Sequence, residues 1–233
     1  MKRIAIFASG NGTNAQNICK YFKSSEDIEV VLLCTNNKNA NVISRLEKYS
    51  VPSFIFSKKE LNNEQLVIEK IKCFKVDYII LAGFLLKIPI FIIDLFENKI
   101  INIHPSLLPK YGGKGMYGEN VHESVIKNKE KDSGITIHFV NNNYDEGGVI
   151  HQEKYLLSER ETVESLSGKV HSLEQKCYPT VIERVIKNII SSCCFLSSGP
   201  GVNPALHTLS SIATHLFTIV RLSIYFFANT APS

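Results

Sequence analysis

The sequence of 233 residues lacks the short spacings that mark metal-binding or disulfide frameworks. None of its six cysteines stands in a C-x-x-C spacing, which argues against a structural zinc site. No secretory signal peptide precedes the cysteines, so we expect a reduced protein in the cytoplasm. An excess of one charge sign is also missing. The 26 basic and 22 acidic residues leave a net charge of +4, which is too small to indicate a nucleic-acid partner.

Charged residues are almost absent from the last part of the chain. Between Asn188 and Ser233 the only charged residue is Arg221, so nearly all basic residues and all acidic residues come earlier. The charged part has the composition of an ordinary globular domain. We therefore divide the chain into a domain of residues 1–190 and an apolar C-terminal tail of residues 191–233.

The tail contains a segment, residues 205–228, that is long enough to span a bilayer, for which about 20 residues are needed. His207, His215 and Arg221 interrupt it, which is unfavourable for a central membrane segment. We interpret the tail as an appended or misread extension. A membrane-associating segment and an added helix packed on the domain are the two alternatives.

Apolar runs alternate with helical patterns through the first hundred residues. This alternation predicts an α/β fold: a doubly wound, mostly parallel, Rossmann-like sheet with helices on both faces. The predicted strands cover residues 1–8, 28–34, 52–56, 77–82 and 99–103, and the predicted helices cover residues 13–23, 39–49, 60–74 and 89–96.

The second half of the domain predicts a different local arrangement. A long loop at residues 104–118 is of the length that is usually functional or mobile. Residues 133–140 alternate as a strand with one wetter face, and residues 149–157 follow as its antiparallel neighbour. A helix over residues 162–190 closes the domain, and Pro179 should interrupt or kink it.

The first candidate site is the segment from Ser9 to Asn14, between the first strand and the first helix. Glycines here allow backbone amides at a helix N-terminus to approach an anion, with Thr13 or Asn14 as the N-cap. The segment matches neither G-x-G-x-x-G nor G-x-x-x-x-G-K-[ST], which disfavours a dinucleotide or a triphosphate. A plain tight turn with an N-cap is the alternative.

The second candidate site is Asn102-Ile103-His104, followed by Pro-Ser-Leu-Leu-Pro. Residues two apart on a strand face the same way, so Asn102 and His104 should project together. They should lie beside the segment from Ser9 to Asn14, which we call the glycine loop. An amide donor next to an imidazolium can hold a developing oxyanion. A lone histidine at a strand end is otherwise most often a satisfied structural residue.

The third candidate site is the polar turn at residues 141–148, in which Asp145 supplies a carboxylate. A carboxylate near an imidazole favours the charged ring and can take part in proton transfer. Taken alone, the turn would be a polar hairpin loop. No serine or cysteine stands in a nucleophile-elbow motif, which argues against a covalent acyl-enzyme.

Together the three segments resemble the phosphoribosylglycinamide formyltransferase family, folate-dependent enzymes of purine biosynthesis. The resemblance covers residues 1 to about 190 in order and spacing, and residues 110–118 are similar to a bacterial subgroup. It implies the fold predicted above. It also implies transfer of the formyl group of 10-formyltetrahydrofolate, as a cosubstrate, to the amine of glycinamide ribonucleotide.

The resemblance also implies roles for individual residues. Gly12, Thr13 and Asn14 would hold the substrate phosphate, and Glu174 would contact the ribose and glycinamide portion. Lys59 would add a contact with the folate tail. The family usually has an arginine where this chain has Leu86. The walls of the folate pocket would be formed by Leu85, Leu86, Lys87, Ile88, Asn102, Asn141, Asn142, Asn143, Tyr144 and Asp145.

The mechanism that the resemblance implies is direct attack of the glycinamide amine on the formyl carbon. Asn102 and protonated His104 would stabilise the tetrahedral oxyanion. Asp145 would keep the imidazole charged and help pass a proton to the leaving folate nitrogen. No metal is required. The expected partners are the two small-molecule substrates and no nucleic acid, and the sequence leaves the oligomeric state open.

Other readings of the same motifs are weighed against this one. Methionyl-tRNA formyltransferases share the Asn-x-His-Pro stretch but need a basic tRNA-binding domain, which residues 191–233 do not supply. Formyltetrahydrofolate deformylases carry an N-terminal regulatory domain, whereas this sequence begins at its first strand. An amino-sugar formyltransferase binds a nucleotide-sugar and would have no need of the glycine loop. A non-catalytic folate-binding relative would have no use for Asn102, His104 and Asp145 together.

Overall fold

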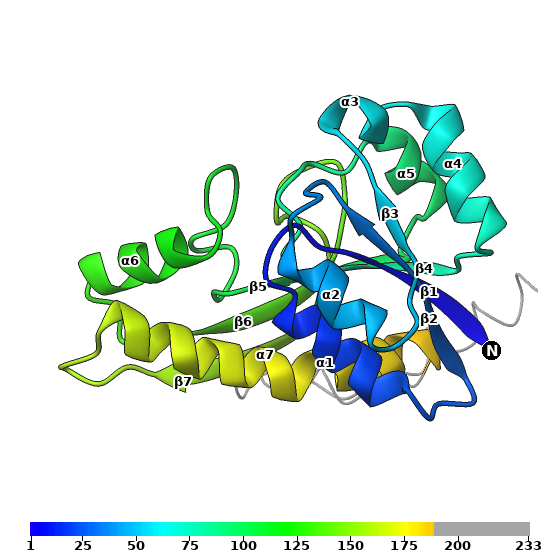
Figure 1. Cartoon of the computed structure of the whole chain (residues 1–233). Helices are drawn as coiled ribbons and strands as arrows, with labels where there is room; N and C mark the ends of the chain where they lie inside the picture. The colour runs from blue at the N-terminus through cyan, green and yellow to red at the C-terminus, as the bar shows by residue number, and fades with distance from the viewer. Residues whose placement is uncertain (189–233) are drawn as a thin grey trace, which may run out of the picture. The chain divides into compact units, whose positions relative to one another are not determined.

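A single seven-stranded sheet organises the protein, seen in the computed structural model of Figure 1, which describes residues 1–188. The strand order is β3-β2-β1-β4-β5-β6-β7. The first five of these strands are parallel, whereas β6 runs antiparallel to both β5 and β7. The predicted mostly parallel α/β fold and the antiparallel pairing of the last two strands are therefore confirmed.

All seven strands that the sequence predicts are present in the described residues, in the predicted order. The strands are β1 (Lys2–Phe7), β2 (Ile28–Thr35), β3 (Ser53–Ile55), β4 (Tyr78–Leu81), β5 (Ile100–His104), β6 (Asp132–Phe139) and β7 (Val149–Leu156). The helices are α1 (Thr13–Phe22), α2 (Asn41–Glu47), α3 (Lys58–Leu61), α4 (Glu64–Cys73), α5 (Ile90–Leu95), α6 (Glu119–Lys127) and α7 (Val163–Ile186).

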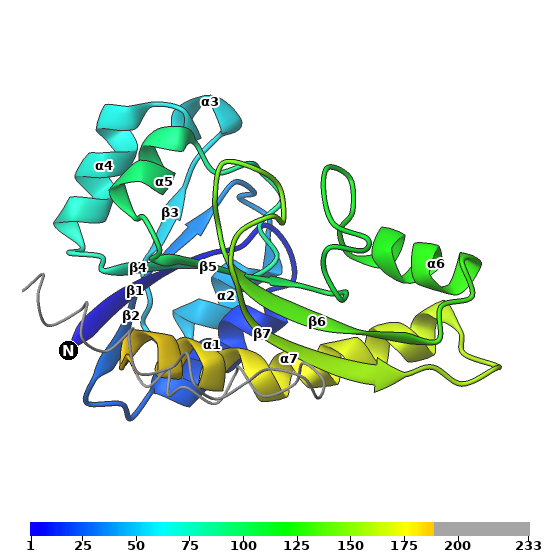
Figure 2. The same ribbon diagram turned by 180° about the vertical axis from the view of Figure 1, so that it is seen from behind.

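Helices cover both faces of the parallel part of the sheet. Ile4 and Ile6 of β1 belong to a buried cluster with residues of α1, α2 and α7, whereas Ala5 and Phe7 belong to a second cluster with residues of α4 and α5. Figures 1 and 2 show α1, α2 and α7 on one side of the strands and α3, α4 and α5 on the other. The alternating side chains of one strand therefore divide between two cores, as in a doubly wound sheet.

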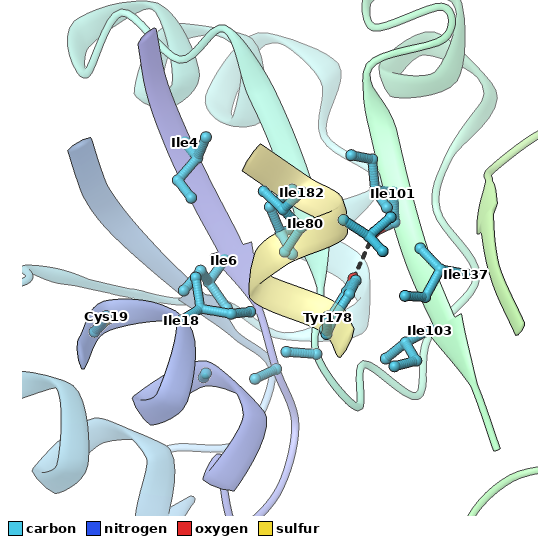
Figure 3. Packing of buried hydrophobic residues seen from close by; sticks show 14 of the residues in the cluster. Ile4, Ile6, Ile18, Cys19, Ile80, Ile101, Ile103, Ile137, Tyr178 and Ile182 are labelled. Atoms are coloured by element: carbon cyan, nitrogen blue, oxygen red, sulfur yellow. Dashed lines mark hydrogen bonds between the residues drawn. The ribbon is translucent and has the colours of Figure 1, made fainter. Parts of the chain in front are cut away.

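Tyr178 fixes α7 to the centre of the sheet. Its side chain is fully buried, and its hydroxyl lies 2.8 Å from the carbonyl of Leu81 and 3.0 Å from that of Ile101. Figure 3 shows the ring between Ile80, Ile101 and Ile103. Leu81 is the last residue of β4 and pairs with Asn102, the neighbour of Ile101 in β5, so the contact holds α7 beside the strand that carries Asn102 and His104.

Pro179 does not interrupt the last helix, because α7 continues through that residue. A proline inside a helix removes the hydrogen bond to the carbonyl four residues earlier. Here that carbonyl belongs to Gln175, and it accepts a 2.7 Å hydrogen bond from the side-chain amide of Asn17 on α1. A neighbouring helix therefore supplies the missing donor.

Two further helix predictions need correction. Residues 60–74 were expected to form one helix, but the chain forms α3 and α4, because Ser57 begins the first with a capping box and Asn63 caps the second. The sequence interpretation also assigned no element to residues 119–127, where the structure has α6. Its buried residues, Val121, His122 and Val125, have the spacing of one helix face.

Within residues 1–188, no helix is long and apolar enough to cross a membrane. The proposed tail, residues 191–233, including the segment 205–228, lies outside the residues that the structure describes, as does the end of the predicted helix 162–190.

Candidate active site

A cavity of about 800 Å³ opens at the carboxyl ends of β1, β4 and β5. Ligands in open α/β sheets collect where the strand order reverses, and here β1 and β4 are neighbours at that point. The cavity is bounded by the loops that follow these strands, by the β6–β7 loop and by parts of α6 and α7. All three segments singled out in the sequence contribute to its walls.

The glycine loop brings the start of α1 to the cavity. The residue before the helix is Gly12, at a φ of 77°, and no side chain caps the helix, so the prediction of Thr13 or Asn14 as the N-cap is wrong. A Cβ on Gly12 would lie 2.4 Å from Val42. Glycine is thus required both for the left-handed backbone and for the close approach of α2. The first amides of α1 are left free for a ligand.

The side chain of Asn14 joins α1 to α7. Its Nδ2 donates to Oε2 of Glu174 at 2.9 Å, and its Oδ1 accepts from Nε2 of Gln175 at 2.6 Å. Glu174 and Asn14 both line the cavity. The two residues assigned to opposite ends of the substrate are therefore in direct contact.

His104 ends β5 and is only 4% exposed. Its Nε2 lies 2.7 Å from the carbonyl of Tyr111. Because a carbonyl only accepts, this nitrogen carries a hydrogen. Its Nδ1 lies 3.6 Å from Oδ2 of Asp145. The carboxylate of Asp145 therefore lies within ion-pair distance of the ring nitrogen that Tyr111 leaves free.

Asp145 occupies the centre of the candidate site. Its Oδ2 accepts a 2.8 Å hydrogen bond from the amide of Gly113, and its Oδ1 lies 3.7 Å from Nε2 of His138. Its backbone has a φ of 55°, in the left-handed region that aspartate tolerates better than most residues. The β6–β7 turn thus brings a carboxylate against the end of β5.

His138 is a site residue that the sequence interpretation placed on a strand but gave no role. It is directly opposite Asn102 in the β5–β6 register, and burial lowers the pKa of His138. Its Nδ1 donates to the carbonyl of Phe139 at 2.8 Å. The bare Nε2 then accepts from Nδ2 of Asn102 at 3.1 Å, which orients that amide. The pairing of residues 102 and 138 is the signal that could have found it.

Residues of both predicted walls of the folate pocket line the cavity. They are Leu85, Leu86, Lys87 and Ile88 from the first wall and Asn141, Asn143, Tyr144 and Asp145 from the second. Lys87 lies over the ring of Tyr144, with 5.5 Å between the ammonium and the ring centroid, so the walls touch. Lys59, on α3, and Asn142 are not among the residues that line the cavity.

Hydrogen bonds to β6 hold the loop after His104. The hydroxyl of Thr136 donates to the carbonyl of Ser106 at 2.7 Å and accepts from the amide of Leu108 at 3.0 Å. Gln152 also donates to the carbonyl of Leu108, at 2.9 Å. The prolines of this segment were expected to fix the loop. These hydrogen bonds supply a further restraint.

Two more histidines line the cavity and were not predicted as site residues. His122 is 5% exposed, and burial lowers its pKa. His171 lies 3.3 Å from Oε2 of Glu174, and this hydrogen bond raises the pKa of His171. His122 escaped notice because α6 was not predicted. His171 is one helical turn before Glu174, a spacing that places both on one face.

Comparison with known proteins agrees with this geometry. The model that defines the formyl transferase family matches residues 2–182. A phosphoribosylglycinamide formyltransferase of Bacillus subtilis is 37% identical over 191 residues, which span 80% of this chain and 95% of that protein. A chloroplastic phosphoribosylglycinamide formyltransferase of Arabidopsis thaliana is 35% identical over 81% of this chain and 67% of its own.

Solved structures show the same similarity. The phosphoribosylglycinamide formyltransferase of Anaplasma phagocytophilum superimposes with a TM-score of 0.74 at 30% identity, over 83% of this chain and 91% of that one. Glycinamide ribonucleotide transformylase 1 of Geobacillus kaustophilus gives 0.73 at 34% identity, over 80% and 99%.

The fold, the cavity and the matched residues define a member of the formyl transferase family. Within it, the chain belongs to the phosphoribosylglycinamide formyltransferases. The resemblance identified in the sequence is thereby confirmed.

Proposed function

We propose that the protein transfers the formyl group of 10-formyltetrahydrofolate to the amine of glycinamide ribonucleotide, by direct attack without a covalent enzyme intermediate. The observation that carries the proposal is that Asn102, His104 and Asp145 line the same cavity as the glycine loop. A phosphate subsite and an oxyanion site are therefore open to one bound pair of substrates. Formylation of glycinamide ribonucleotide, measured against rival acceptors, tests it.

Asn102 and His104 stabilise the tetrahedral oxyanion in this proposal. His138 accepts one N–H of the Asn102 amide, which leaves the second N–H for the developing oxygen anion. The Nε2 of His104 is engaged by Tyr111, so Nδ1 is the nitrogen that faces the reacting centre. Preorganised donors of this kind act mainly on the transition state.

Asp145 assists proton transfer. At 3.6 Å from Nδ1 of His104, its carboxylate is at ion-pair rather than hydrogen-bond distance. A proton released by the attacking amine can pass through this pair, or through a water between them, to the leaving folate nitrogen. The amide of Gly113 holds Asp145 in place.

The two substrates occupy opposite ends of the cavity. The free amides at the start of α1, at Gly12, Thr13 and Asn14, hold the phosphate of glycinamide ribonucleotide, and Glu174 contacts its ribose and glycinamide portion. The folate lies between the segments 85–88 and 141–145.

Asn14→Asp is expected to raise KM for glycinamide ribonucleotide by about tenfold or more and to leave KM for the folate within about threefold. The new carboxylate would oppose the phosphate and the carboxylate of Glu174, and like charges at contact distance cost about 1 kcal/mol or more. Steady-state kinetics with each substrate varied in turn measure the effect.

Asn17→Asp is the matched control for this prediction. It puts the same charge on α1 and breaks a hydrogen bond to α7, but Asn17 does not line the cavity. Equal increases in KM for both substrates in Asn14→Asp, or the same increase in Asn17→Asp, would show that the loop has only a structural role.

A chain that ends at Asn188 is expected to retain full activity and to be more soluble than the complete chain. Every proposed site residue precedes the last turns of α7. Residues 1–190 form one compact unit. An uncovered apolar segment favours association. Activity and light scattering of the two chains measure this. If the shortened chain lost its fold or its activity, residues 189–233 would belong to the enzyme.

A further inference from the structure

Three side chains able to bind a metal ion meet between β7 and α7. They are His151 and Glu153 on β7 and Cys177 on α7, and one ligand atom from each lies within 4.8 Å of the other two. None of them lines the active-site cavity. The transfer mechanism therefore gives them no role.

The strand geometry explains why they meet. Residues two apart on a strand project from the same face, and His151 and Glu153 are both partly buried while Gln152 and Lys154 between and beyond them are exposed. Cys177 is 7% exposed and belongs to the buried side of α7. The partly buried face of β7 thus presents an imidazole and a carboxylate to a buried thiol.

The distances suit a small divalent ion. With bonds of about 2.0–2.3 Å, the ligand atoms of a tetrahedral zinc ion lie about 3.5 Å apart. Nε2 of His151 and Oε2 of Glu153 are separated by 3.5 Å. The Sγ of Cys177 lies within 4.8 Å of a ligand atom of each of the other two residues. The partial exposure of His151 and Glu153 leaves a route for the ion and a fourth position for water.

We propose that His151, Glu153 and Cys177 form a binding site for Zn²⁺, with water as the fourth ligand. Mixed nitrogen, oxygen and sulfur donors are the set that zinc accepts. On binding, the Cys177 thiol gives up its proton to solvent, so a thiolate and a carboxylate balance the charge of the ion. Arg184, whose charge acts on both His151 and Cys177, opposes the ion and limits its affinity.

The site would join an edge strand to a helix. In the described sheet β7 pairs only with β6, and it follows directly on the turn that carries Asp145. A metal bond to Cys177 would fix β7 on α7, independently of the transfer chemistry. This differs from the expectation of no structural zinc, which rested on the absence of C-x-x-C spacing. The third ligand stands 24 residues after Glu153, where sequence spacing gives no signal.

Cobalt titration of the complete, metal-stripped chain tests the proposal. Co²⁺ bound by a thiolate produces a charge-transfer absorption band, and we expect one equivalent to bind with this band. Cys177→Ser should abolish the band, and His151→Gln should weaken Co²⁺ binding by at least tenfold. Zn²⁺ should raise the Tm of the unmodified chain but not that of Cys177→Ser.

Two controls separate this site from the other thiols. Cys73→Ser removes an exposed thiol on α4, and the double variant Cys193→Ser/Cys194→Ser removes the two thiols that are adjacent in the sequence of the tail. Both should keep the band. The proposal is overturned if no thiolate band forms, if the band survives Cys177→Ser, or if His151→Gln binds Co²⁺ as tightly as the unmodified chain. His151→Gln provides the test even if Cys177→Ser does not fold.

Discussion

Replacement of His104 by alanine is expected to lower kcat by about 10²–10³-fold, with KM for both substrates within about threefold of the parent. The ring lies at the end of β5, 3.6 Å from Asp145, and its proposed role is to stabilise the oxyanion and move a proton. Groups with these roles contribute about 3–4 kcal/mol each to the transition state. Single-turnover and steady-state kinetics measure the loss.

A structural role for His104 predicts a different outcome. Its Nε2 also donates to the carbonyl of Tyr111, so alanine leaves a buried acceptor unpaired and lowers Tm. His104→Gln can retain a donor for that carbonyl but cannot carry a positive charge. If His104→Gln kept a parental Tm and a kcat within about tenfold of the parent, the proposed chemical role would be wrong.

Asp145→Asn is expected to reduce kcat by about a hundredfold or more while the protein keeps its fold. Asparagine has the same shape, tolerates the left-handed backbone at this position and still accepts from the amide of Gly113. It places no negative charge beside Nδ1 of His104, so both the proposed oxyanion stabilisation and the proposed proton transfer weaken. Kinetics and thermal unfolding, measured on the same preparation, separate the two effects.

Glu146→Gln is the matched control for Asp145→Asn. It removes the same charge from the same loop, but Glu146 is exposed and pairs with the side chain of Asn143 rather than with a histidine. We expect kcat to stay within about threefold of the parent. Equal losses in both variants would assign the effect to the charge of the loop rather than to the contact with His104.

The parallel sheet could be predicted because its strands are buried on both faces and therefore appear as apolar runs. Individual side-chain hydrogen bonds, which decide where a helix begins, continues or ends, could not be predicted from the sequence. Pro179 was expected to interrupt or kink the last helix, but α7 continues through it. The carbonyl that Pro179 leaves without a helical donor accepts instead from Asn17, 162 residues before the proline. The separation of α3 from α4 depends on a second cap at Asn63. The helix α6 begins directly after the predicted loop 104–118, but no element was assigned to its residues.

The presence of Asn102, His104 and Asp145 in one cavity could be predicted. Asn102 and His104 stand at the end of a predicted strand, and Asp145 stands in a predicted turn. The side chains that hydrogen-bond to these and other proposed site residues could not be predicted in the same way. His138 orients Asn102 only because β5 and β6 pair in one particular register. Asn14 was assigned to the phosphate, but its side chain is bonded to Glu174 and Gln175, so its backbone amide remains the contact for an anion.

The central claim is tested most directly by incubating the purified chain with 10-formyltetrahydrofolate and one acceptor at a time, and by measuring the mass of each acceptor. The acceptors are glycinamide ribonucleotide, methionyl-tRNA, an amino-sugar nucleotide and water. We predict catalytic formylation of glycinamide ribonucleotide, much faster than that of methionyl-tRNA or the amino-sugar nucleotide. With water as the only acceptor, we predict no release of free formate above the uncatalysed rate. Formylation of another acceptor in its place, catalysed formate release, or folate binding without transfer to glycinamide ribonucleotide by the folded protein would contradict the account.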